Sequence, residues 1–199
     1  MTQSISVRPV RGKADIKAFL DVPFPIYRND PNWVAPLYLE RLEHLDPKKN
    51  PYFKHAVVEL FLAERAGKPV GRISAQICQL RSERYKDGVG QFGFLEAEDD
   101  PAVFAALVTA ASDWLKARGA IRMQGPFSLS INDETGLLIE GFGTPPSMMM
   151  GHAPPYYSAR LDQLGFHKAK DVIAYDFLDA GEPSRAMKSA AQKALADPD

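Results

Sequence analysis

Hydrophobic and polar positions follow regular periods along the chain, and the most regular unit spans residues 90–119. Residues 91–97 form a short run of aromatic, branched and small side chains, which is typical of a strand buried on both faces. After an acidic turn, apolar residues recur every three or four positions, which predicts a helix with one apolar stripe. Pro101 suits the first turn of this helix and Gly119 its C-terminal end. The unit is therefore predicted to be strand, acidic turn and helix.

An antiparallel hairpin is predicted before this unit. Apolar patterning predicts strands at residues 57–64 and 70–80, joined by a glycine-containing turn at 65–69. The same patterns predict further strands at residues 4–10, 121–127, 147–152 and 166–177, and further helices at residues 15–22, 36–45, 132–141 and 155–164. Loops are predicted at residues 24–36, 46–53 and 81–88.

The order of these elements predicts an α/β protein with a central mixed, largely antiparallel sheet flanked by helices. Two parallel strands, at residues 91–97 and 121–127, are expected to flank the helix that begins at Pro101. We expect one domain over residues 1–178 and a polar tail over residues 179–199. The tail contains almost no large apolar residue, so it is predicted to be either a solvent-facing helix or a linker.

Charge and hydropathy narrow the class of protein. The 24 lysines and arginines nearly balance the 25 aspartates and glutamates, so charge gives no reason to expect a nucleic-acid partner or an anionic membrane. No run approaches the ~20 apolar residues of a membrane span, and residues 1–9 lack the apolar segment of a signal peptide. We therefore expect a cytoplasmic protein without a transmembrane segment.

Cysteine and histidine usage excludes several kinds of site. The single cysteine, Cys78, cannot form an internal disulfide or a multi-cysteine zinc site. It lies in a strand-like run and is interpreted as a small buried hydrophobe, with a reactive thiol as the alternative. The four histidines show no ligand spacing, so no metal site is expected.

Polar residues gather directly after the strand predicted at residues 121–127, at the end of the sheet where α/β proteins bind ligands. Ser128 and Ser130 offer hydroxyl groups to a carbonyl or phosphate group of a substrate, and Asn132 lies beside them. The alternative is structural: Asn132 caps the helix predicted at residues 132–141, and the two acidic residues that follow favour its dipole.

A second unusual stretch spans residues 148–157. Three adjacent methionines cannot all face one core, so some are expected to line a groove, and Met149 is taken as a substrate contact. His152 has a pKa range suited to proton transfer, and Tyr156 or Tyr157 can serve as an acid. The alternative is that His152 is only a hydrogen-bonded loop residue.

Glu96 closes the predicted core strand and is a candidate base toward an amine. The alternative is a solvated charge at the end of a strand. Other enzyme classes lack support, because the chain contains no Ser-His-Asp signature, no nucleophile elbow and no Walker loop.

Three stretches resemble the GNAT superfamily of acyl-CoA N-acyltransferases. The hairpin turn reads Gly-Lys-Pro-Val-Gly at residues 67–71, the core strand ends in Phe-Leu-Glu-Ala at 94–97, and a helix ends in Leu-Gly-Phe at 164–166. The resemblance covers about residues 5–177 and implies the GNAT-like acyltransferase fold. It also implies that acyl-CoA or another acyl thioester is a co-substrate, with no permanently bound cofactor.

The acyl-donor region both resembles the family and departs from it. Phe94, Leu95 and Ala97 match the strand end at which the family binds the donor, which implies that they contact it here. The family's glycine-containing pyrophosphate loop is replaced by Ala-Glu-Asp-Asp-Pro at residues 97–101. Its carboxylates repel a pyrophosphate, and Pro101 lacks an amide to bind one. We therefore expect the usual coenzyme A contacts to be missing.

The family's catalytic helix also differs. Its Asn, and the Tyr that protonates the departing thiolate, match Pro154 and Leu161, neither of which can take those roles. Two hypotheses follow. In the first, the protein moves an acyl group from a small-molecule thioester to an amine, with Glu96 or His152 as base. In the second, it is a non-catalytic domain of the same fold that serves as a binding or structural half, in a homodimer or beside a second acyltransferase-like domain.

Overall fold

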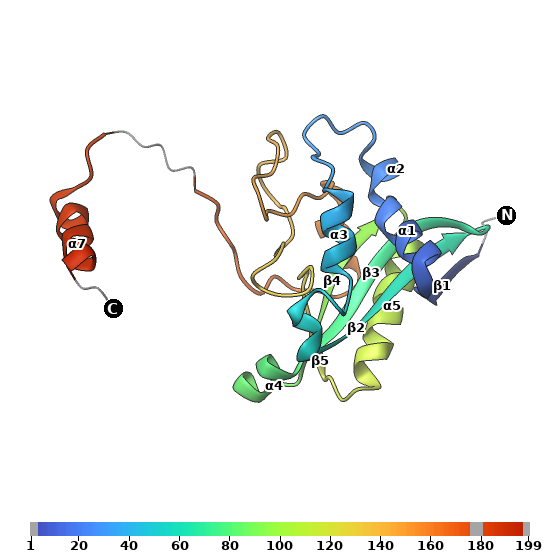
Figure 1. Cartoon of the computed structure of the whole chain (residues 1–199). Coiled ribbons are helices and arrows are strands. Elements are labelled where there is room, and N and C mark those ends of the chain that lie inside the picture. Colours follow the sequence, from blue (N-terminus) through green and yellow to red (C-terminus); the bar gives the residue numbers. More distant parts are fainter. Residues whose placement is uncertain (1–3, 176–180, 197–199) are drawn as a thin grey trace. The chain divides into compact units, whose positions relative to one another are not determined.

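A five-stranded sheet forms the centre of the protein. The computed structural model describes residues 4–175 and 181–196, and the chain divides into two units, Met1–His167 and Lys168–Asp199. In the first unit the strands are ordered β1 (Ile5–Pro9), β2 (Ala56–Arg65), β3 (Lys68–Cys78), β4 (Val89–Ala97) and β5 (Arg122–Gln124). The first four are antiparallel neighbours and β5 is parallel to β4, which confirms the predicted mixed, largely antiparallel sheet (Figure 1).

Helices cover both faces of this sheet. They are α1 (Gly12–Asp21), α2 (Pro23–Tyr27), α3 (Tyr38–His44), α4 (Gln79–Tyr85), α5 (Pro101–Lys116) and α6 (Tyr156–Gln163), with a 3-10 turn at Pro51–Lys54. Helix α5 lies on one face, and α1 to α3 lie on the other (Figure 1). Each face has its own apolar core: Phe104 and Leu107 of α5 contribute to one, and Phe19 and Leu20 of α1 to the other. In the second unit, α7 (Arg185–Ala196) has every described side chain exposed.

The hairpin and the capped helix follow the sequence closely. Ala66 and Gly67 form a two-residue turn between β2 and β3, and both have positive φ angles, of 51° and 75°. At the start of α5 the side chain of Asp100 accepts a hydrogen bond from the amide of Ala102 at 2.8 Å. The predicted core strand, acidic turn and helix are therefore confirmed as β4, its turn and α5.

The helix predicted at residues 132–141 is wrong. Gly136 and Gly141 have φ angles of 89° and 87°, which an α-helix does not accommodate. The hydroxyl of Thr135 donates to nearby backbone carbonyls, and Ser130 bonds within the same loop. These local bonds satisfy polar groups without a helix, so Asn132 caps no helix.

Two predicted strands are also wrong. Residues 147–152 form no strand, and the described part of the strand predicted at 166–177 does not join the sheet. Residues 176–177 lie outside the described residues. Met149 has a φ angle of 64°, which interrupts an extended conformation. Residues 168–175 are all exposed, so burial of an apolar face does not hold this described part of the chain against a neighbouring strand.

Other boundaries shift for local reasons. The loop predicted at residues 81–88 contains most of α4, which begins at Gln79 because the Cys78 sulfur caps it, accepting from the amide of Arg81 at 3.5 Å. Cys78 is half-buried, so it is only in part the buried hydrophobe expected. The loop predicted at residues 24–36 contains most of α2.

Strand β5 is shorter than predicted because the chain leaves the sheet after Gln124. The amide of Phe127 donates to the carbonyl of Phe92 at 2.7 Å, so the backbone crosses over β4 at Gly93. A Cβ atom on Gly93 would overlap the carbonyl of Phe127 and lie 2.9 Å from the amide nitrogen of Ser128. Glycine at this position therefore permits the crossing.

A bulge in β4 sets the direction of the residues that follow it. Arg72 pairs with Glu96 and Ser74 with Gly93, so Phe94 and Leu95 together oppose one residue of β3. Phe94 has a φ angle of 46°, which is uncommon for an aromatic residue.

The bulge changes which side chains share a face. Phe92 and Leu95 both enter the core beneath α5 although they are three positions apart, whereas strict alternation would place them on opposite faces. The bulge therefore turns Glu96 away from the α5 core and toward the opposite face.

Candidate active site

An open cleft of about 260 Å³ lies over the end of β4. One wall comes from residues 33–41, which contribute Trp33, Val34 and Arg41, and the other comes from the three methionines at 148–150. Two charged residues of the sheet, Arg72, which is buried, and Glu96, which is partly buried, also line the cleft. The lining therefore mixes apolar side chains with polar and charged ones, among them Glu40, Glu134 and His152, and the sheet contributes a carboxylate and a guanidinium group.

The carboxylate of Glu96 is held by two tyrosines. Its Oε2 atom accepts hydrogen bonds from the hydroxyls of Tyr27 at 2.8 Å and Tyr157 at 2.7 Å. Only 14% of the side chain is exposed, so Glu96 is not a solvated charge at the end of a strand. Burial raises the pKa of the Glu96 carboxyl above its ordinary value, although Arg72 and the two tyrosines oppose the shift.

Arg72 faces Glu96 from the neighbouring strand. Its Nη2 atom lies 3.8 Å from Oε1 of Glu96, and its Nη1 atom donates to the carbonyl of Phe19 at 3.0 Å. The guanidinium group lies over the rings of Phe19 and Phe94, 5.0 and 5.6 Å from their centroids. Burial lowers the pKa of Arg72, and the Glu96 carboxylate opposes this. The sequence reasoning missed Arg72, although a charged residue within a buried apolar strand is a usable signal.

Tyr27 was also missed as a site residue. Its hydroxyl contacts Oε2 of Glu96 and the backbone carbonyl of His152, at 2.8 and 3.1 Å, and its ring stacks on Trp33 at 5.0 Å. Burial, and then the Glu96 charge, raises the pKa of the Tyr27 hydroxyl far above its ordinary value. The proline- and aromatic-rich loop predicted at residues 24–36 indicated tight packing here, but not the contact with Glu96.

The two predicted tyrosines have different environments. The Tyr157 hydroxyl is buried between Glu96 and Ala97, donating to the first and accepting from the amide of the second at 2.9 Å. The Tyr156 hydroxyl donates to the carbonyl of Ala97 at 2.8 Å and is only partly buried. Burial raises the pKa of both phenols. Both tyrosines thus hold the end of β4.

His152 lines the cleft but does not contact the Glu96 carboxylate directly. Its Nε2 atom lies 2.7 Å from Oδ2 of Asp30, and 5% of its side chain is exposed. This hydrogen bond lowers the pKa of the Asp30 carboxyl. The pair joins the loop after α2 to the loop before α6, so it holds the two walls of the cleft together.

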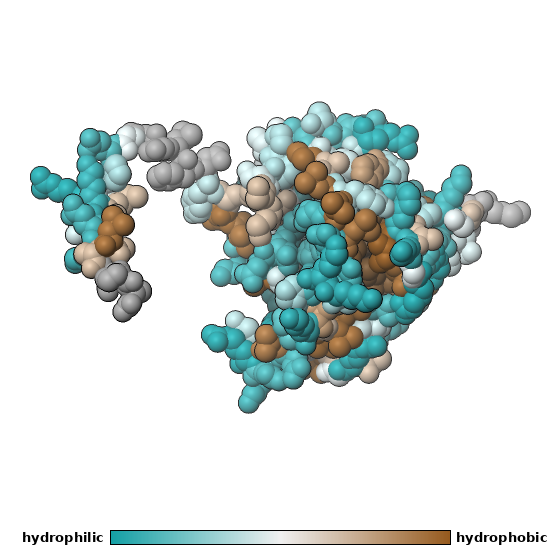
Figure 2. Space-filling model, in the orientation of Figure 1, coloured by the Kyte–Doolittle hydropathy of each residue, from teal (hydrophilic) through white to brown (hydrophobic). Residues whose placement is uncertain are grey.

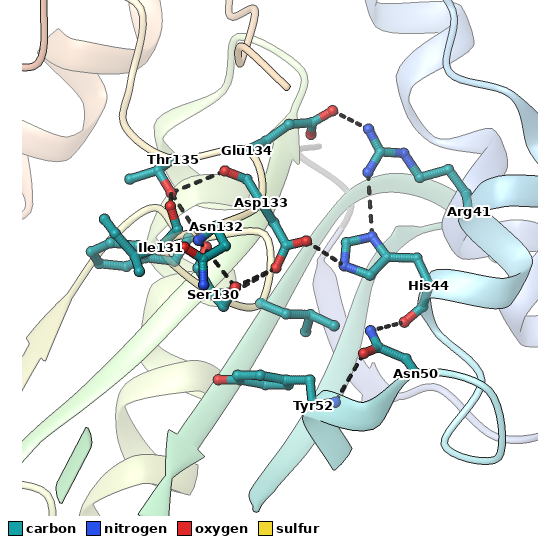
Figure 3. A network of polar contacts seen from close by, with 12 residues as sticks. Arg41, His44, Asn50, Tyr52, Ser130, Ile131, Asn132, Asp133, Glu134 and Thr135 are labelled. Atoms are coloured by element: carbon teal, nitrogen blue, oxygen red, sulfur yellow. Dashed lines mark hydrogen bonds and ion pairs between the residues drawn. The ribbon is translucent and has the colours of Figure 1, made fainter. Parts of the chain in front are cut away.

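A polar network braces α3 against the loop after β5 (Figure 3). Arg41 forms an ion pair with Glu134, and Nε2 of His44 lies 3.4 Å from Oδ1 of Asp133. Ser130 donates to the other Asp133 oxygen at 2.6 Å. The pKa of Asp133 is lowered, because bonds from His44 and Ser130 outweigh the opposing effect of burial. The network fixes the wall that carries Arg41.

The structure therefore separates the polar residues predicted after β5. Ser130 belongs to the Asp133 network, Asn132 is exposed, and Ser128 is buried with its amide bonded to the carbonyl of Glu134. None of the three lines the cleft, whereas Glu134 does. The methionines lie on the cleft, and Met149 is 59% exposed.

The residues proposed to contact an acyl donor lie at the bulge. Phe94, Leu95 and Ala97 are all buried, with Phe94 in the core on the α1 side and the other two beneath α5. Both backbone polar groups of Ala97 already bond to tyrosine hydroxyls.

The acidic turn after β4 is tied down by two arginines. Arg65 bonds Glu98 at 2.8 Å and Asp100 at 2.5 Å, and Arg160 bonds Asp99 at 2.6 Å. The first amides of α5 are also occupied: residues 102–104 all donate to Asp100, and Pro101 has no amide hydrogen. A pyrophosphate approaching this helix end thus finds carboxylates and no free amide.

Removing two of these carboxylates should strengthen coenzyme A binding. The double variant combines Glu98→Ser with Asp99→Ser. It makes Arg160 and one side of Arg65 available to phosphate oxygens, while Asp100 still caps α5. We expect calorimetry to show a Kd for coenzyme A that is lower by about 3- to 30-fold at low salt. The matched control is Asp113→Ser, an exposed acid at the other end of α5. Unchanged affinity in the double variant would mean that the pyrophosphate never approaches this turn.

Apolar side chains remain exposed beside the cleft. Figure 2 shows them gathered in a band over the face that α1 to α3 cover. Those exposed between residues 24 and 42 are Phe24, Val34, Leu37, Tyr38, Leu39 and Leu42. Exposed patches of this kind mark binding surfaces for apolar ligands or partners.

Neither a membrane helix nor a metal cluster is evident in the part of the chain that the structure describes. Within residues 4–175 and 181–196, no helix combines the length and apolar character needed to cross a bilayer. Over the same ranges, His, Cys, Asp and Glu side chains form no group of three or more suited to a metal ion.

The chain is similar to two curated proteins over most of its length. It is 50% identical over 179 residues to bacterial ceramide synthase of Caulobacter vibrioides, covering 89% of this chain and 47% of that protein. It is 51% identical over 179 residues to protein YghO of Escherichia coli K12, covering 88% of this chain and 46% of that protein. The chain thus spans about half the length of these relatives. No family model matches it.

Solved structures show the fold. The aminoglycoside N-acetyltransferase AAC(6')-Iy, bound to a coenzyme A bisubstrate analogue, superposes with a TM-score of 0.50 at 16% identity, over 88% of this chain and 99% of that one. A transcriptional regulator from Bacillus halodurans superposes with a TM-score of 0.52 at 14% identity, over 87% of this chain and 100% of that one. The protein has a GNAT-like acyltransferase fold.

Proposed function

We propose that the protein is an N-acyltransferase that moves an acyl group from an acyl thioester to the amine of a lipid. The observation that carries this proposal is the partly buried Glu96 carboxylate, positioned by two tyrosines at an open cleft whose lining includes three methionines. A carboxylate with a raised pKa is a better base at neutral pH than an ordinary one, and amide formation needs a base.

The reaction balances with Glu96 as the single base. The amine nitrogen attacks the thioester carbonyl carbon, forming the C–N bond, and the C–S bond then breaks to release a thiolate. Glu96 takes the proton that the amine loses, and the thiolate gains a proton from an acid. Tyr156 or Tyr157 is the proposed acid, and Tyr156 is the less buried of the two.

Other residues of the site take supporting roles in this proposal. Tyr27 and Tyr157 fix the Glu96 carboxylate, and His152 positions Tyr27 through its backbone carbonyl. We assign the role of general base to Glu96 rather than to His152, because the Nε2 atom of His152 is already hydrogen-bonded to Asp30. Met149 is proposed to contact an alkyl chain. The segment with Ser128, Ser130 and Asn132 is proposed to act indirectly, by supporting Glu134, which lines the cleft.

The acceptor class rests on two supports. One relative is named a ceramide synthase, and ceramide is an amide of a fatty acid with a long-chain amine. Three methionines, Trp33 and Val34 form part of the cleft lining, and further apolar side chains are exposed beside it, which suits alkyl chains. Acyl-CoA is the proposed donor.

A second candidate function is a binding or structural half without catalysis. It is favoured by the occupied amides at the start of α5 and by the acidic turn, which together disfavour the usual pyrophosphate contact. The relatives are about twice as long as the match, which leaves room in them for a second domain of similar size.

Amide formation tests the first candidate against the second. The protein is incubated with acetyl-, octanoyl- or palmitoyl-CoA and a long-chain primary amine, and the amide is measured by mass spectrometry. We expect an amide with at least one longer-chain donor, and equal activity in the control Glu140→Gln, which replaces an exposed loop carboxylate outside the cleft lining. If no donor gives an amide but a donor still raises the Tm, the non-catalytic function is supported instead.

A further inference from the structure

The Arg72 side chain is buried, yet most of its hydrogen-bond donors have no partner among the described residues. Only 7% of the residue is exposed, and the guanidinium group carries five N–H donors. Its Nη1 atom donates to the carbonyl of Phe19, whereas Nε has no partner and Nη2 lies 3.8 Å from Glu96. Buried charged donors without partners are costly, so they call for a functional explanation.

Packing fixes this guanidinium group at the cleft. Its central carbon lies 5.0 and 5.6 Å from the ring centroids of Phe19 and Phe94, and the two rings hold the side chain in place. Arg72 lines the same cleft as Glu96, which is the residue paired with it on β4. Arg72 therefore offers the cleft a preorganised positive charge with free donors.

The two oxygens of the Glu96 carboxylate have different surroundings. Oε2 accepts the hydrogen bonds from Tyr27 and Tyr157, whereas Oε1 faces Nη2 of Arg72 at 3.8 Å, which is longer than a hydrogen bond. When an amine attacks a thioester, its nitrogen and the carbonyl oxygen become bonded to the same carbon. A base for the nitrogen and a donor for the oxygen must therefore lie side by side, as Oε1 and Nη2 do.

We propose that Arg72 is a catalytic residue that donates to the carbonyl oxygen of the thioester and stabilises the oxyanion formed when the amine attacks. This inference rests on the proposed function, because it places the attacking nitrogen at Glu96. Donors of this kind are effective when they are fixed in advance at the position where negative charge develops.

Other donors near the end of β4 are less suited to this role. Arg41, the other arginine of the cleft lining, already forms an ion pair with Glu134. The amide of Ala97 already donates to the hydroxyl of Tyr157 at 2.9 Å. Arg72 is the donor that combines a positive charge, a fixed position and unmet hydrogen bonds.

The charges of the proposed step are matched to the site. The nitrogen forms the C–N bond, the π electrons of the carbonyl move to its oxygen, and Glu96 takes the proton that the nitrogen loses. One negative charge thus moves from the carboxylate to the neighbouring oxyanion, and Arg72 lies beside both. The C=O bond then forms again as the C–S bond breaks, and the departing thiolate gains a proton from Tyr156 or Tyr157. A guanidinium group that balances the carboxylate is therefore placed to balance the oxyanion that replaces it.

Arg72→Lys should lower kcat for amide formation by about 10- to 100-fold, and kcat/KM to a similar extent. Lysine keeps a positive charge beside Glu96 but loses the planar arrangement of donors. The control is Arg122→Lys, which makes the same change at an exposed position of β5 and should keep the natural kcat. If Arg72→Lys does not fold, Arg72→Gln, which lacks the charge, replaces it.

Infrared spectroscopy tests the contact without turnover. The probe is S-hexanoyl-N-acetylcysteamine labelled with carbon-13 at the carbonyl, a thioester that lacks the pyrophosphate of coenzyme A. In the natural protein its carbonyl band should lie at lower wavenumber than for the free thioester in water, because a charged donor polarises the C=O bond. The shift should be largely lost in the Arg72 variants and kept in Arg122→Lys.

The two measurements separate this inference from the proposed function. An unshifted band, no binding of the thioester, a shift that persists without Arg72, or a natural kcat in the Arg72 variants would each overturn the role of Arg72. Amide formation by the natural protein would still support N-acyl transfer in each of these cases. A shift that depends on Arg72, without any amide product, would support the contact with the carbonyl and refute the catalytic function.

Discussion

Replacing Glu96 by glutamine is expected to lower kcat for amide formation by about 10²- to 10⁴-fold, the usual contribution of a general base. Glutamine keeps the shape of the side chain, and its carbonyl oxygen still accepts hydrogen bonds from Tyr27 and Tyr157. The fold should therefore survive, which the Tm and circular dichroism would verify. Glu140→Gln is the matched control. Full activity in Glu96→Gln would remove Glu96 from the mechanism.

The same pair of proteins should differ in their response to pH. Because burial raises the pKa of Glu96 above 4.5, the acid limb of kcat/KM in the natural protein should lie above that value. The free energy of unfolding should change with pH in the opposite sense, because the folded state favours the protonated Glu96 carboxyl. Glu96 therefore makes its full contribution to stability below the pKa of the carboxyl in the unfolded chain, and this contribution is lost as pH rises through its pKa in the folded protein. Glu96→Gln should lack that decline. Parallel stability curves for the two proteins would contradict the raised pKa.

Replacing Gly93 by alanine is expected to lower the free energy of unfolding by about 3 kcal/mol or more. The added Cβ atom meets the backbone of Phe127 and Ser128 rather than a flexible side chain, so no rotamer change relieves the overlap. Gln76 also holds this crossing, donating from its side chain to the carbonyl of Phe127 at 2.8 Å. Urea denaturation measures the loss.

The control for this variant is Gly143→Ala, where an added Cβ atom meets no atom within 4 Å. Its effect should stay within about 0.5 kcal/mol. A Gly93→Ala protein as stable as this control would show that the backbone of residues 127–128 can move away from β4 at little cost. The short β5 and the position of the loop after it would then need another explanation.

The sequence alone determined the elements whose causes are local. The β2–β3 hairpin follows from apolar strands around a glycine turn, and α5 follows from an aspartate cap, a proline and a continuous apolar stripe. These elements, with β4, were sufficient to predict the sheet and its GNAT-like fold.

The structure of two loop regions could not be predicted from sequence patterns. Residues 132–141 include residue types that favour a helix start. The two glycines with positive φ angles and the bonds between Ser130 and Asp133 stabilise a loop there instead. A strand was predicted at residues 166–177, but in its described part residues 168–175 are exposed and pack on no core. In the first case, competing local bonds decide the outcome, and in the second the outcome depends on contacts that a short sequence window does not contain.

The candidate site shows the same division. Glu96 could be predicted because it ends a core strand, but its burial depends on a bulge that reverses the strand's alternation after Gly93. Its partners Tyr27 and Arg72 are distant in sequence and meet it only because α2 and β3 pack against the end of β4. Sequence patterns fix which side chains are available; tertiary packing decides which of them share a buried, low-dielectric site, and that sharing sets their chemistry.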